Sequence, residues 1–347
     1  MNDKEQYQAE QTRLIESLGK LTEGGIVESM QHIGATSLPG LSASPCVDIA
    51  LSIWPFPLLE GAVSKLDALG YQILEGYTAA PQQRFCHRSG CFQLFCVESG
   101  SEDWLDLVLV NEYLQYNEEA RAEISTRKAN FSVDKSALFS GLLPEAQQWW
   151  VGHYGFSPVE AVAGEMRNAS FEWYVSGGWA LDLFLDRVER VHHDVDLVIP
   201  RQYQLELQKY LTERGWTLLT PFEKRLEPWP PYMRLELPRH QVHAFRDEQF
   251  IDLLLTDTQD VWRYRREPLV LRSKEKMSLV SKSGIPYLAP ELVLLFKSKN
   301  TSNRERSKDQ PDIEKTLPHF EPERRAWLYW ALMATNPDHA WIKHLVS

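Results

Sequence analysis

Residues 173–198 read WYVSGGWALDLFLDRVERVHHDVDLV, and this stretch decides the expected fold of the second half of the chain. Residues 173–175 have the character of a strand, which enters a turn at Gly177 and Gly178 and leaves as an apolar helix. Glycines let a ligand approach the backbone closely, and the amides at the start of a helix favour phosphate oxygens. The turn is therefore a candidate phosphate-binding loop, although on the two glycines alone an ordinary strand-to-helix turn is the favoured interpretation.

Two aspartates follow about sixteen residues after the turn, with apolar residues between and beyond them. Asp194 and Asp196 are two positions apart, so on a strand both side chains leave the same face, with Cα atoms about 6.6 Å apart. Carboxylates held in this way can share one or two Mg²⁺ ions, which require oxygen ligands. A solvated pair on an edge strand is the alternative, and the preceding glycine turn favours the metal site.

The combined pattern resembles the signature of aminoglycoside and lincosamide nucleotidyltransferases, members of the DNA polymerase β-like nucleotidyltransferase superfamily. It is most similar to the aminoglycoside 2″-O-nucleotidyltransferase type. The positions that carry the resemblance are Gly177, Gly178, Trp179, Ala180, Leu181, Asp182, Arg187, Arg190, His192, Asp194 and Asp196. Residues 284–291 and 294–297, and Lys308 and Asp309 with Asp312, are similar to the helical half of related proteins. Asp186 stands where the family usually has glycine, and Ser176 stands where a third glycine is frequent.

The resemblance implies that Asp194 and Asp196 bind metal and that a third acid on a neighbouring strand completes the site and acts as general base. Asp252, within the apolar run 250–255, is the best candidate for the third acid, and Asp257 is the reserve. The reaction implied is Mg²⁺-dependent transfer of a nucleoside monophosphate to a hydroxyl of a small molecule. ATP is the expected donor, with another nucleoside triphosphate as the alternative.

The resemblance also implies a nucleotide-binding set around the turn. Ser176 and the amides of Gly177 and Gly178 are expected to hold the β- and γ-phosphates. Arg190 and His192 are expected to organise the turn before the aspartates, and a structural role for His192 is equally compatible. Lys297 is a candidate phosphate contact, although a lysine that ends an apolar helix face often only extends its ammonium to solvent.

The first half carries a different signature, His-Ile-Gly-Ala-Thr-Ser-Leu-Pro-Gly-Leu at 32–41, followed by residues 45–49 with Asp48. This pattern resembles the GrpB-like family, which is also assigned to the nucleotidyltransferase superfamily. Its turn could again hold phosphate. The position two residues after Asp48 is Ala50, so the paired carboxylate is absent, and Asp106 on a later strand is a possible second acid. We therefore expect a degenerate domain that binds or scaffolds.

A length of 347 residues predicts two domains, and Ser157-Pro158 marks a helix start near which the boundary falls. The expected domains are 1–156, GrpB-like, and 157–347, catalytic. The expected fold class is α/β (α+β): two tandem nucleotidyltransferase folds, each a mixed sheet with flanking helices, and a helical carboxyl-terminal tail. Helices are expected at 4–22, 58–69, 117–130, 159–168 and 202–214, and strands at 46–54, 71–74, 83–87, 92–97, 105–110, 173–175, 216–219, 232–236, 240–246 and 250–255. The stretch 299–310 is charged and is expected to be flexible.

The composition limits the partners. Lys and Arg number 37 and Asp and Glu number 48, which gives a net charge of −11. This charge disfavours nucleic acid and anionic membranes, which need a basic surface, and suits a cationic acceptor such as an aminoglycoside. No apolar window reaches the length of a membrane span, so a cytoplasmic location is expected. Disulfides are not expected among the four cysteines. The spacing of Cys86, Cys91 and Cys96, with His87, is unlike a structural zinc site, and buried thiols in strands are favoured.

Two other functions compete with small-molecule modification. A toxin-like transferase that modifies protein or tRNA belongs to the same chemistry, but the missing basic stripe counts against tRNA. A non-catalytic nucleotide-binding module is the second, and Ala50 in the first half favours it there. The three aspartates of the second half, Asp194, Asp196 and Asp252, argue against a non-catalytic module there.

Overall fold

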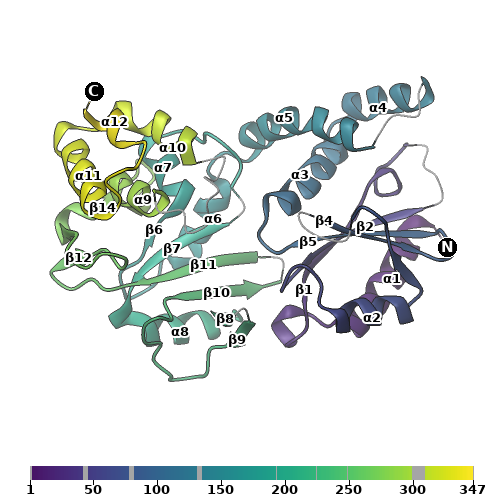
Figure 1. The fold of residues 1–347 in the computed structure, drawn as a ribbon, viewed down its shortest axis with the longest axis horizontal. Helices are drawn as coiled ribbons and strands as arrows, with labels where there is room; N and C mark the ends of the chain where they lie inside the picture. The colour runs from purple at the N-terminus through teal and green to yellow at the C-terminus, as the bar shows by residue number, and fades with distance from the viewer. Residues whose placement is uncertain are drawn as a thin grey trace. The chain divides into compact units, whose positions relative to one another are not determined.

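The chain forms two compact units in a computed structural model (Figure 1): Met1–His153 with Pro221–Glu227, and Tyr154–Thr220 with Pro228–Ser347. The structure describes residues 2–41, 46–77, 82–130, 135–192, 194–223, 225–247, 249–298 and 309–346, without the side chains of 126–130 and 135–140. Each unit is built on its own sheet with flanking helices, so the predicted fold class is confirmed.

The first unit contains a mixed sheet that has five strands over the described residues, in the order β1-β2-β5-β4-β3. These strands are β1 (Val27–Ile33), β2 (Val47–Ile53), β3 (Tyr71–Ile73), β4 (Gln82–His87) and β5 (Phe92–Glu98). Strand β2 is parallel to β5, and the other pairs are antiparallel. Every residue of β2 is buried, because helices cover both faces of this central strand.

The helices of the first unit are α1 (Asp3–Leu18), α2 (Glu60–Ala68), α3 (Glu102–Tyr116), α4 (Glu118–Asn130) and α5 (Lys135–Tyr154). Leu14 of α1 and Leu66 of α2 share one apolar core with Ile49 and Leu51 of β2. Trp104 of α3 packs with a separate cluster on the opposite face, which is formed by Ile33, Ala50 and Phe95. Successive strand residues thus alternate between α1 and α2 on one side and α3 on the other.

The second unit is built on a mixed sheet that has eight strands over the described residues, in the order β14-β15-β6-β7-β11-β10-β8-β9, although residues 221–227 at its edge are grouped with the first unit. These are β6 (Tyr174–Val175), β7 (Val195–Pro200), β8 (Thr217–Phe222), β9 (Arg225–Pro228), β10 (Gln241–Arg246), β11 (Gln249–Thr256), β14 (Ser278–Val280) and β15 (Pro286–Leu288). Strands β7, β11 and β10 run side by side in Figure 1, with β7 parallel to β11 and β10 antiparallel to β11. A separate ribbon pairs β12 (Val261–Arg263) with β13 (Leu271–Ser273).

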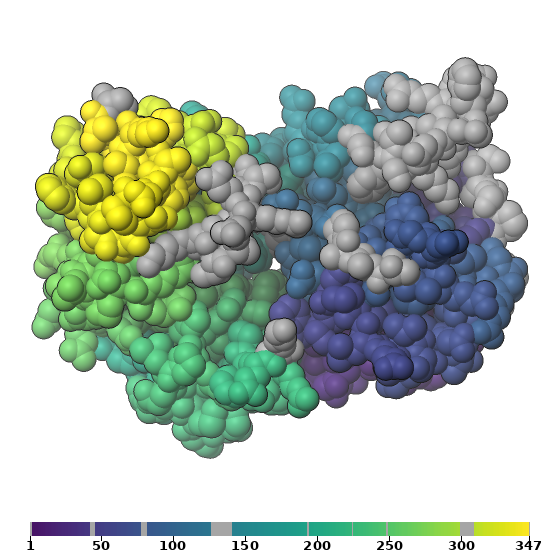
Figure 2. Space-filling model, in the orientation of Figure 1, coloured from purple at the N-terminus to yellow at the C-terminus, as the bar shows by residue number. Residues whose placement is uncertain are grey.

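The helices of the second unit are α6 (Ser157–Met166), α7 (Gly177–Leu185), α8 (Gln204–Thr212), α9 (Pro290–Lys297), α10 (Asp309–Thr316), α11 (Pro322–Thr335) and α12 (Ile342–Val346). Pro158 lies in the first turn of α6, as the Ser-Pro pair predicts. The helical tail from Pro290 onward is confirmed, and its last two helices form one compact surface, yellow in Figure 2. None of the described helices combines the length and the apolar character needed to cross a membrane.

Two predicted strands are wrong. Residues 105–110 lie inside helix α3, which begins at Glu102 because the Ser101 side chain accepts a hydrogen bond from the Trp104 amide. Asp106 is therefore on a helix, not on a strand. Residues 232–236 form no strand, and β9 at 225–228 takes the place next to β8 instead. The expectation of flexibility at 299–310 lies largely outside the described residues.

Leu197 tests the core of the second unit, since its side chain is fully buried in β7. We expect Leu197→Ala to lower the free energy of unfolding by about 2–5 kcal/mol, because it removes buried methyl groups and leaves a cavity. Leu269→Ala, at a position that is 87% exposed, should change it by less than about 0.5 kcal/mol. Urea denaturation measures both, and equal effects of the two changes would contradict the assignment.

Candidate active site

Strand register brings the three predicted metal ligands together. Strands β7 and β11 are parallel, and Asp196 is the direct register partner of Asp252, so both side chains leave the same face of the sheet. Asp194 directly precedes β7. One carboxylate oxygen from each of these three residues lies within 4.8 Å of the others. We call Asp194, Asp196 and Asp252 the carboxylate cluster.

Asp252 is the buried member of the carboxylate cluster. Burial, and then the nearby carboxylates of Asp196 and Asp194, raise the pKa of Asp252 well above its ordinary value. A hydrogen bond from the Gln241 side-chain amide to Asp252 Oδ2, at 2.7 Å, acts in the opposite direction. The other oxygen, Oδ1, is buried and accepts no hydrogen bond from the described residues, and His243 Nε2 lies 3.9 Å from it. An acceptor in this position is costly unless a proton or a cation meets it.

The donor set of the carboxylate cluster fits a hard divalent cation. All three groups offer carboxylate oxygen, which is the ligand type of Mg²⁺, and the orphaned Oδ1 of Asp252 supplies a buried lone pair. A bound dication also offsets the mutual repulsion that raises the pKa of Asp252. The residues therefore fit one or two Mg²⁺ ions, and the assignment of the metal stays a prediction.

Gly177 lies against the carboxylate cluster. Its φ is +61°, a left-handed conformation that favours glycine, and a Cβ built on it would lie 1.8 Å from Oδ2 of Asp196. The Ser176 amide donates a 2.8 Å hydrogen bond to the Asp196 carbonyl, which fixes the turn on β7. Helix α7 starts at this point, so its amino-terminal amides begin next to the Asp196 side chain.

Gly178 makes room for the residues that precede the aspartates. A Cβ on Gly178 would lie 2.3 Å from the His192 ring and 2.5 Å from Nη2 of Arg190. His192 is buried, lies against Trp179 at a centroid distance of 4.4 Å with the rings tilted by 35°, and pairs through Nε2 with Oδ2 of Asp182 at 2.6 Å. Burial raises the pKa of the Asp182 carboxyl to about 7. These contacts support a role for His192 in holding the turn.

Arg190 and Lys297 form a cluster of ion pairs with Asp309 and Asp312. Arg190 binds the Asp312 carboxylate through Nε and Nη2, at 3.2 and 3.3 Å. Lys297 Nζ lies 2.8 Å from Asp312 and 3.0 Å from Asp309. Burial alone would raise the pKa of Asp312, but Lys297 and Arg190 together lower it. With its side chain only 12% exposed, Lys297 does not simply reach into solvent, and its contact with phosphate stays a prediction.

Three residues of this region were not found from the sequence. Asp182 and Asp312 lie within quoted motifs but received no role, since their side-chain partners, His192 for Asp182 and Arg190 with Lys297 for Asp312, are visible only in the fold. Gln241, on β10, had no local signal at all. The reserve candidate Asp257 lies apart from the carboxylate cluster, where its half-exposed carboxylate pairs with Nε of Arg201 at 2.8 Å.

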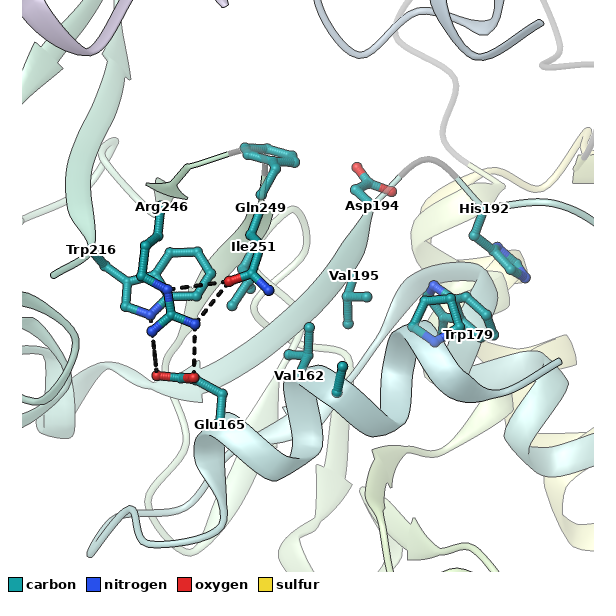
Figure 3. A pocket seen from close by; sticks show the side chains of 13 residues that line it. Val162, Glu165, Trp179, His192, Asp194, Val195, Trp216, Arg246, Gln249 and Ile251 are labelled. Carbon is teal, nitrogen blue, oxygen red and sulfur yellow. Dashed lines mark hydrogen bonds and ion pairs between the residues drawn. The ribbon is translucent and has the colours of Figure 1, made fainter. Parts of the chain in front are cut away.

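A cavity of about 250 Å³ adjoins the site between α6 and the sheet (Figure 3). Val195 and Ile251, register partners on β7 and β11, line it together with Val162 of α6. These two strand residues face the side opposite Asp196 and Asp252. Asp194 stands at the cavity wall and also belongs to the carboxylate cluster, so it connects the two.

The cavity is also lined by the ion pair between Glu165 and Arg246, drawn with dashed lines in Figure 3. Nη1 and Nη2 of Arg246 each lie 3.0 Å from the Glu165 carboxylate, and the guanidinium covers the Trp216 ring at 4.5 Å. The hydrogen bond from Arg246 lowers the pKa of Glu165, burial works against it, and the Trp216 indole N–H adds to the lowering.

A glycine turn set against paired strand carboxylates defines the second unit as a nucleotidyltransferase-type domain, and comparisons with known proteins agree. The family model described as Aminoglycoside-2″-adenylyltransferase matches residues 159–266. The model described as GrpB protein matches residues 2–138. The chain thus carries a GrpB domain and an aminoglycoside-2″-adenylyltransferase domain in tandem, so the predicted resemblance to both families is confirmed.

Individual relatives are more distant. A UPF0157 protein of Streptomyces coelicolor is 29% identical over 136 residues, which are 39% of this chain and 64% of that protein's length. GrpB from Enterococcus faecalis has a TM-score of 0.36 at 18% identity, over 42% of this chain and 92% of that one. The antibiotic-resistance factor ANT(2″)-Ia has a TM-score of 0.37 at 14% identity, over 54% and 94%. Lincomycin-bound LnuA, a lincosamide antibiotic adenylyltransferase, has 0.34 at 14%, over 46% and 95%.

Substitution of Gly177 tests the close approach of the turn to the carboxylate cluster. We expect Gly177→Ala to weaken Mn²⁺ binding and to lower the free energy of unfolding by about 1–3 kcal/mol, since the new methyl group would collide with Asp196 at a positive φ. Gly164→Ala in α6 is the control, where a Cβ meets nothing within 4 Å, and it should be neutral or stabilise by up to about 1 kcal/mol. Similar behaviour of both variants in Mn²⁺ titration and urea denaturation would refute the contact.

The ion pair of Glu165 predicts a pH dependence of stability. The pKa of Glu165 is lowered in the folded chain, so its stabilisation is complete above the ordinary value of 4.5 and is lost as the pH falls through the folded pKa. Glu165→Gln should therefore cost about 1 kcal/mol at pH 7 and nothing in acid below the folded pKa. Urea denaturation across pH measures this. Glu160→Gln, at an exposed position of the same helix, should show neither effect.

Proposed function

We propose that residues 157–347 form a Mg²⁺-dependent nucleotidyltransferase that transfers a nucleoside monophosphate, AMP from ATP in the first instance, to a hydroxyl of a small molecule. The observation that carries this proposal is the carboxylate cluster, with three oxygens within 4.8 Å of one another and one buried oxygen that accepts no hydrogen bond within the described part of the chain. The family of the matching domain supports the same chemistry. Residues 1–156 form the other, GrpB-like domain of this proposal.

The carboxylate cluster is the place for the metal. Asp194, Asp196 and Asp252 would hold one or two ions, each through carboxylate oxygen. When bound, Mg²⁺ supplies positive charge that offsets the negative charge developing on the transferred phosphoryl group. The other tasks, which are phosphate binding, positioning and proton transfer, belong to the side chains and amides of the chain itself.

The glycine turn is the expected phosphate site. Ser176 and the amides of Gly177 and Gly178 begin helix α7, whose amino-terminal dipole favours phosphate oxygens. Gly177 faces Asp196, so a triphosphate held at the turn would lie next to the carboxylate cluster. His192 and Arg190 pack against Gly178 and fix the path of the chain into Asp194.

Proton transfer falls to Asp252. Its Oδ1 is the carboxylate oxygen left without a hydrogen bond, whereas Oδ2 is held by Gln241. An acceptor hydroxyl within hydrogen-bond reach of Oδ1 would pass its proton to this atom as the oxygen attacks the α-phosphorus. The bond from the α-phosphorus to the bridging oxygen breaks, and pyrophosphate leaves.

The ion-pair cluster sets a condition for Lys297. Its ammonium binds both Asp309 and Asp312, so contact with a phosphate would require it to exchange one carboxylate for the other anion. Arg190 shares Asp312 with Lys297, which links the turn to α9 and α10. We infer that this cluster positions both cations for the triphosphate.

The acceptor is proposed from charge and family. A net charge of −11 favours a cationic acceptor, and the matching family model is named for aminoglycosides. An aminoglycoside hydroxyl is therefore the first choice and a lincosamide hydroxyl the second. We place the enzyme in the cytoplasm, where nucleoside triphosphates are available.

The reaction can be measured as pyrophosphate release with each nucleoside triphosphate and Mg²⁺ against a panel of aminoglycosides and lincosamides, with product mass to identify the transferred group. We expect Asp252→Asn to lower the rate by about 10²–10⁴-fold, since it removes the base and a metal ligand. Asp257→Asn is the matched control, because this half-exposed aspartate pairs only with Arg201 in the described contacts, and its rate should stay within about twofold.

Other outcomes have a defined meaning. Release that does not depend on Asp252, or that falls equally in Asp257→Asn, would contradict the assigned base. Nucleotide binding that persists in an Asp194→Ala, Asp196→Ala double variant, together with no release by the wild type, would identify a binding module instead of an enzyme.

A further inference from the structure

The two sheets share a core of five strands. In both units these strands have the same order and the same directions, with two parallel strands at the centre. The corresponding strands are β1 and β6, β2 and β7, β5 and β11, β4 and β10, and β3 and β8. The helix before the first strand of this core is α1 in one unit and α6 in the other, and the helix after the second strand is α2 or α8. We call these five strands the shared core.

Strand register aligns the two cores residue by residue. Asp48 is the parallel partner of Gln93, as Asp196 is the parallel partner of Asp252. A Cβ on Gly34, whose φ is +74°, would lie 2.5 Å from Asp48 Oδ2, in the same way as Gly177 meets Asp196. Asp48 therefore corresponds to Asp196.

This alignment corrects the sequence interpretation that compared Ala50 with the second aspartate. Since Asp48 corresponds to the second acid of the carboxylate cluster, the position of Asp194 is taken by Cys46, two residues earlier. The position of Asp252 is taken by Gln93, on the parallel strand. Two of the three carboxylates are thus replaced by a thiol and an amide, neither of which is the anionic oxygen that Mg²⁺ prefers.

A helix covers this face of the first core. Trp104 and Leu107 of α3 pack against Ala50 of β2 on this face. Because side chains alternate along a strand, Asp48 and Gln93 lie on the same face as Ala50. Asp48 is accordingly only 7% exposed. Helix α3 follows β5 in the chain, and β11 is the strand that corresponds to β5. Strand β11 leads into the β12–β13 ribbon, so no described helix of the second unit follows it directly in the place of α3.

The same helix occupies the glycine turn. Asn111 of α3 accepts a 3.1 Å hydrogen bond from the Gly34 amide through Oδ1, and Ser37 Oγ lies 2.9 Å from the same oxygen. The side-chain amide of Asn111 donates to the His32 carbonyl at 3.3 Å. An amide of the turn that would face a phosphate oxygen is therefore already used within the unit, which argues against the expected phosphate site at residues 34–37.

We propose that the first unit is a closed, metal-free copy of the second, and that the chain binds divalent cation and nucleotide only in the second unit. The ligand changes at Cys46 and Gln93 remove the metal, and α3 with Asn111 fills the space above the turn. The inference rests on the proposed function only in taking Asp194, Asp196 and Asp252 as the metal ligands. On this proposal the first unit has a structural or protein-binding role.

The equivalent aspartates give a matched pair for a test on the full-length chain, with Mn²⁺ binding measured by electron paramagnetic resonance. Asp196→Asn should weaken Mn²⁺ binding about tenfold or more, whereas Asp48→Asn should leave affinity and stoichiometry unchanged. Loss of bound Mn²⁺ in Asp48→Asn would overturn the proposal. If the wild type binds no Mn²⁺ at all, the proposed function fails while the metal-free first unit stands.

Hydrogen exchange on the wild-type chain covers the case in which Asp48→Asn does not fold. With Mn²⁺ and a non-hydrolysable ATP analogue, backbone amides in peptides spanning 174–182 and 190–198 should exchange more slowly. Peptides spanning 31–38 and 46–52 should exchange at the same rate with and without ligand. Ligand-dependent protection at 31–38 would show that the first turn binds phosphate and would refute the closed copy.

Discussion

The parallel pairing of β7 with β11 is the constraint on which the site depends, because it places Asp196 directly opposite Asp252. Two acids in this register cannot move apart without breaking the centre of the sheet. Burial and the repulsion between these acids raise the pKa of Asp252, and its buried Oδ1 accepts no hydrogen bond from the described residues, with His243 Nε2 3.9 Å away. The backbone register therefore holds the carboxylates close enough to share a cation.

The surrounding contacts serve this pairing from regions far apart in sequence. The lack of a side chain at Gly177 lets the turn lie against the Asp196 side chain, and at Gly178 it leaves room for His192 and Arg190. Arg190 reaches Asp312, 122 residues later, so the helical tail fixes the approach to the strand. The two glycines thus allow the close packing at the turn, and buried ion pairs hold Arg190 in place.

The sequence predicted the parts of this arrangement that local chemistry determines. Alternation around Asp194 and Asp196 indicated a strand with both acids on one face, and the apolar run around Asp252 indicated its neighbour. The sequence-based predictions failed where a helix cap or the strand register determines the structure. The Ser101 cap turned residues 105–110 into a helix, and Ala50 was compared with the wrong aspartate because strand pairing is invisible in a single sequence. Partners such as Gln241 and Asp312 required the fold itself.

The spacing between equivalent positions differs along the chain, although their places in the two ladders agree. Gly34 and Gly177 are 143 residues apart, Asp48 and Asp196 are 148 apart, and Gln93 and Asp252 are 159 apart. The segments that connect the strands therefore differ in length between the two units, while the register of the paired strands is the same. Any search for the common ancestry of the halves has to superpose the ladders first, because an alignment with one fixed offset of 148 residues would match Asp48 with Asp196 but would miss both the glycine turn and the Gln93–Asp252 pair.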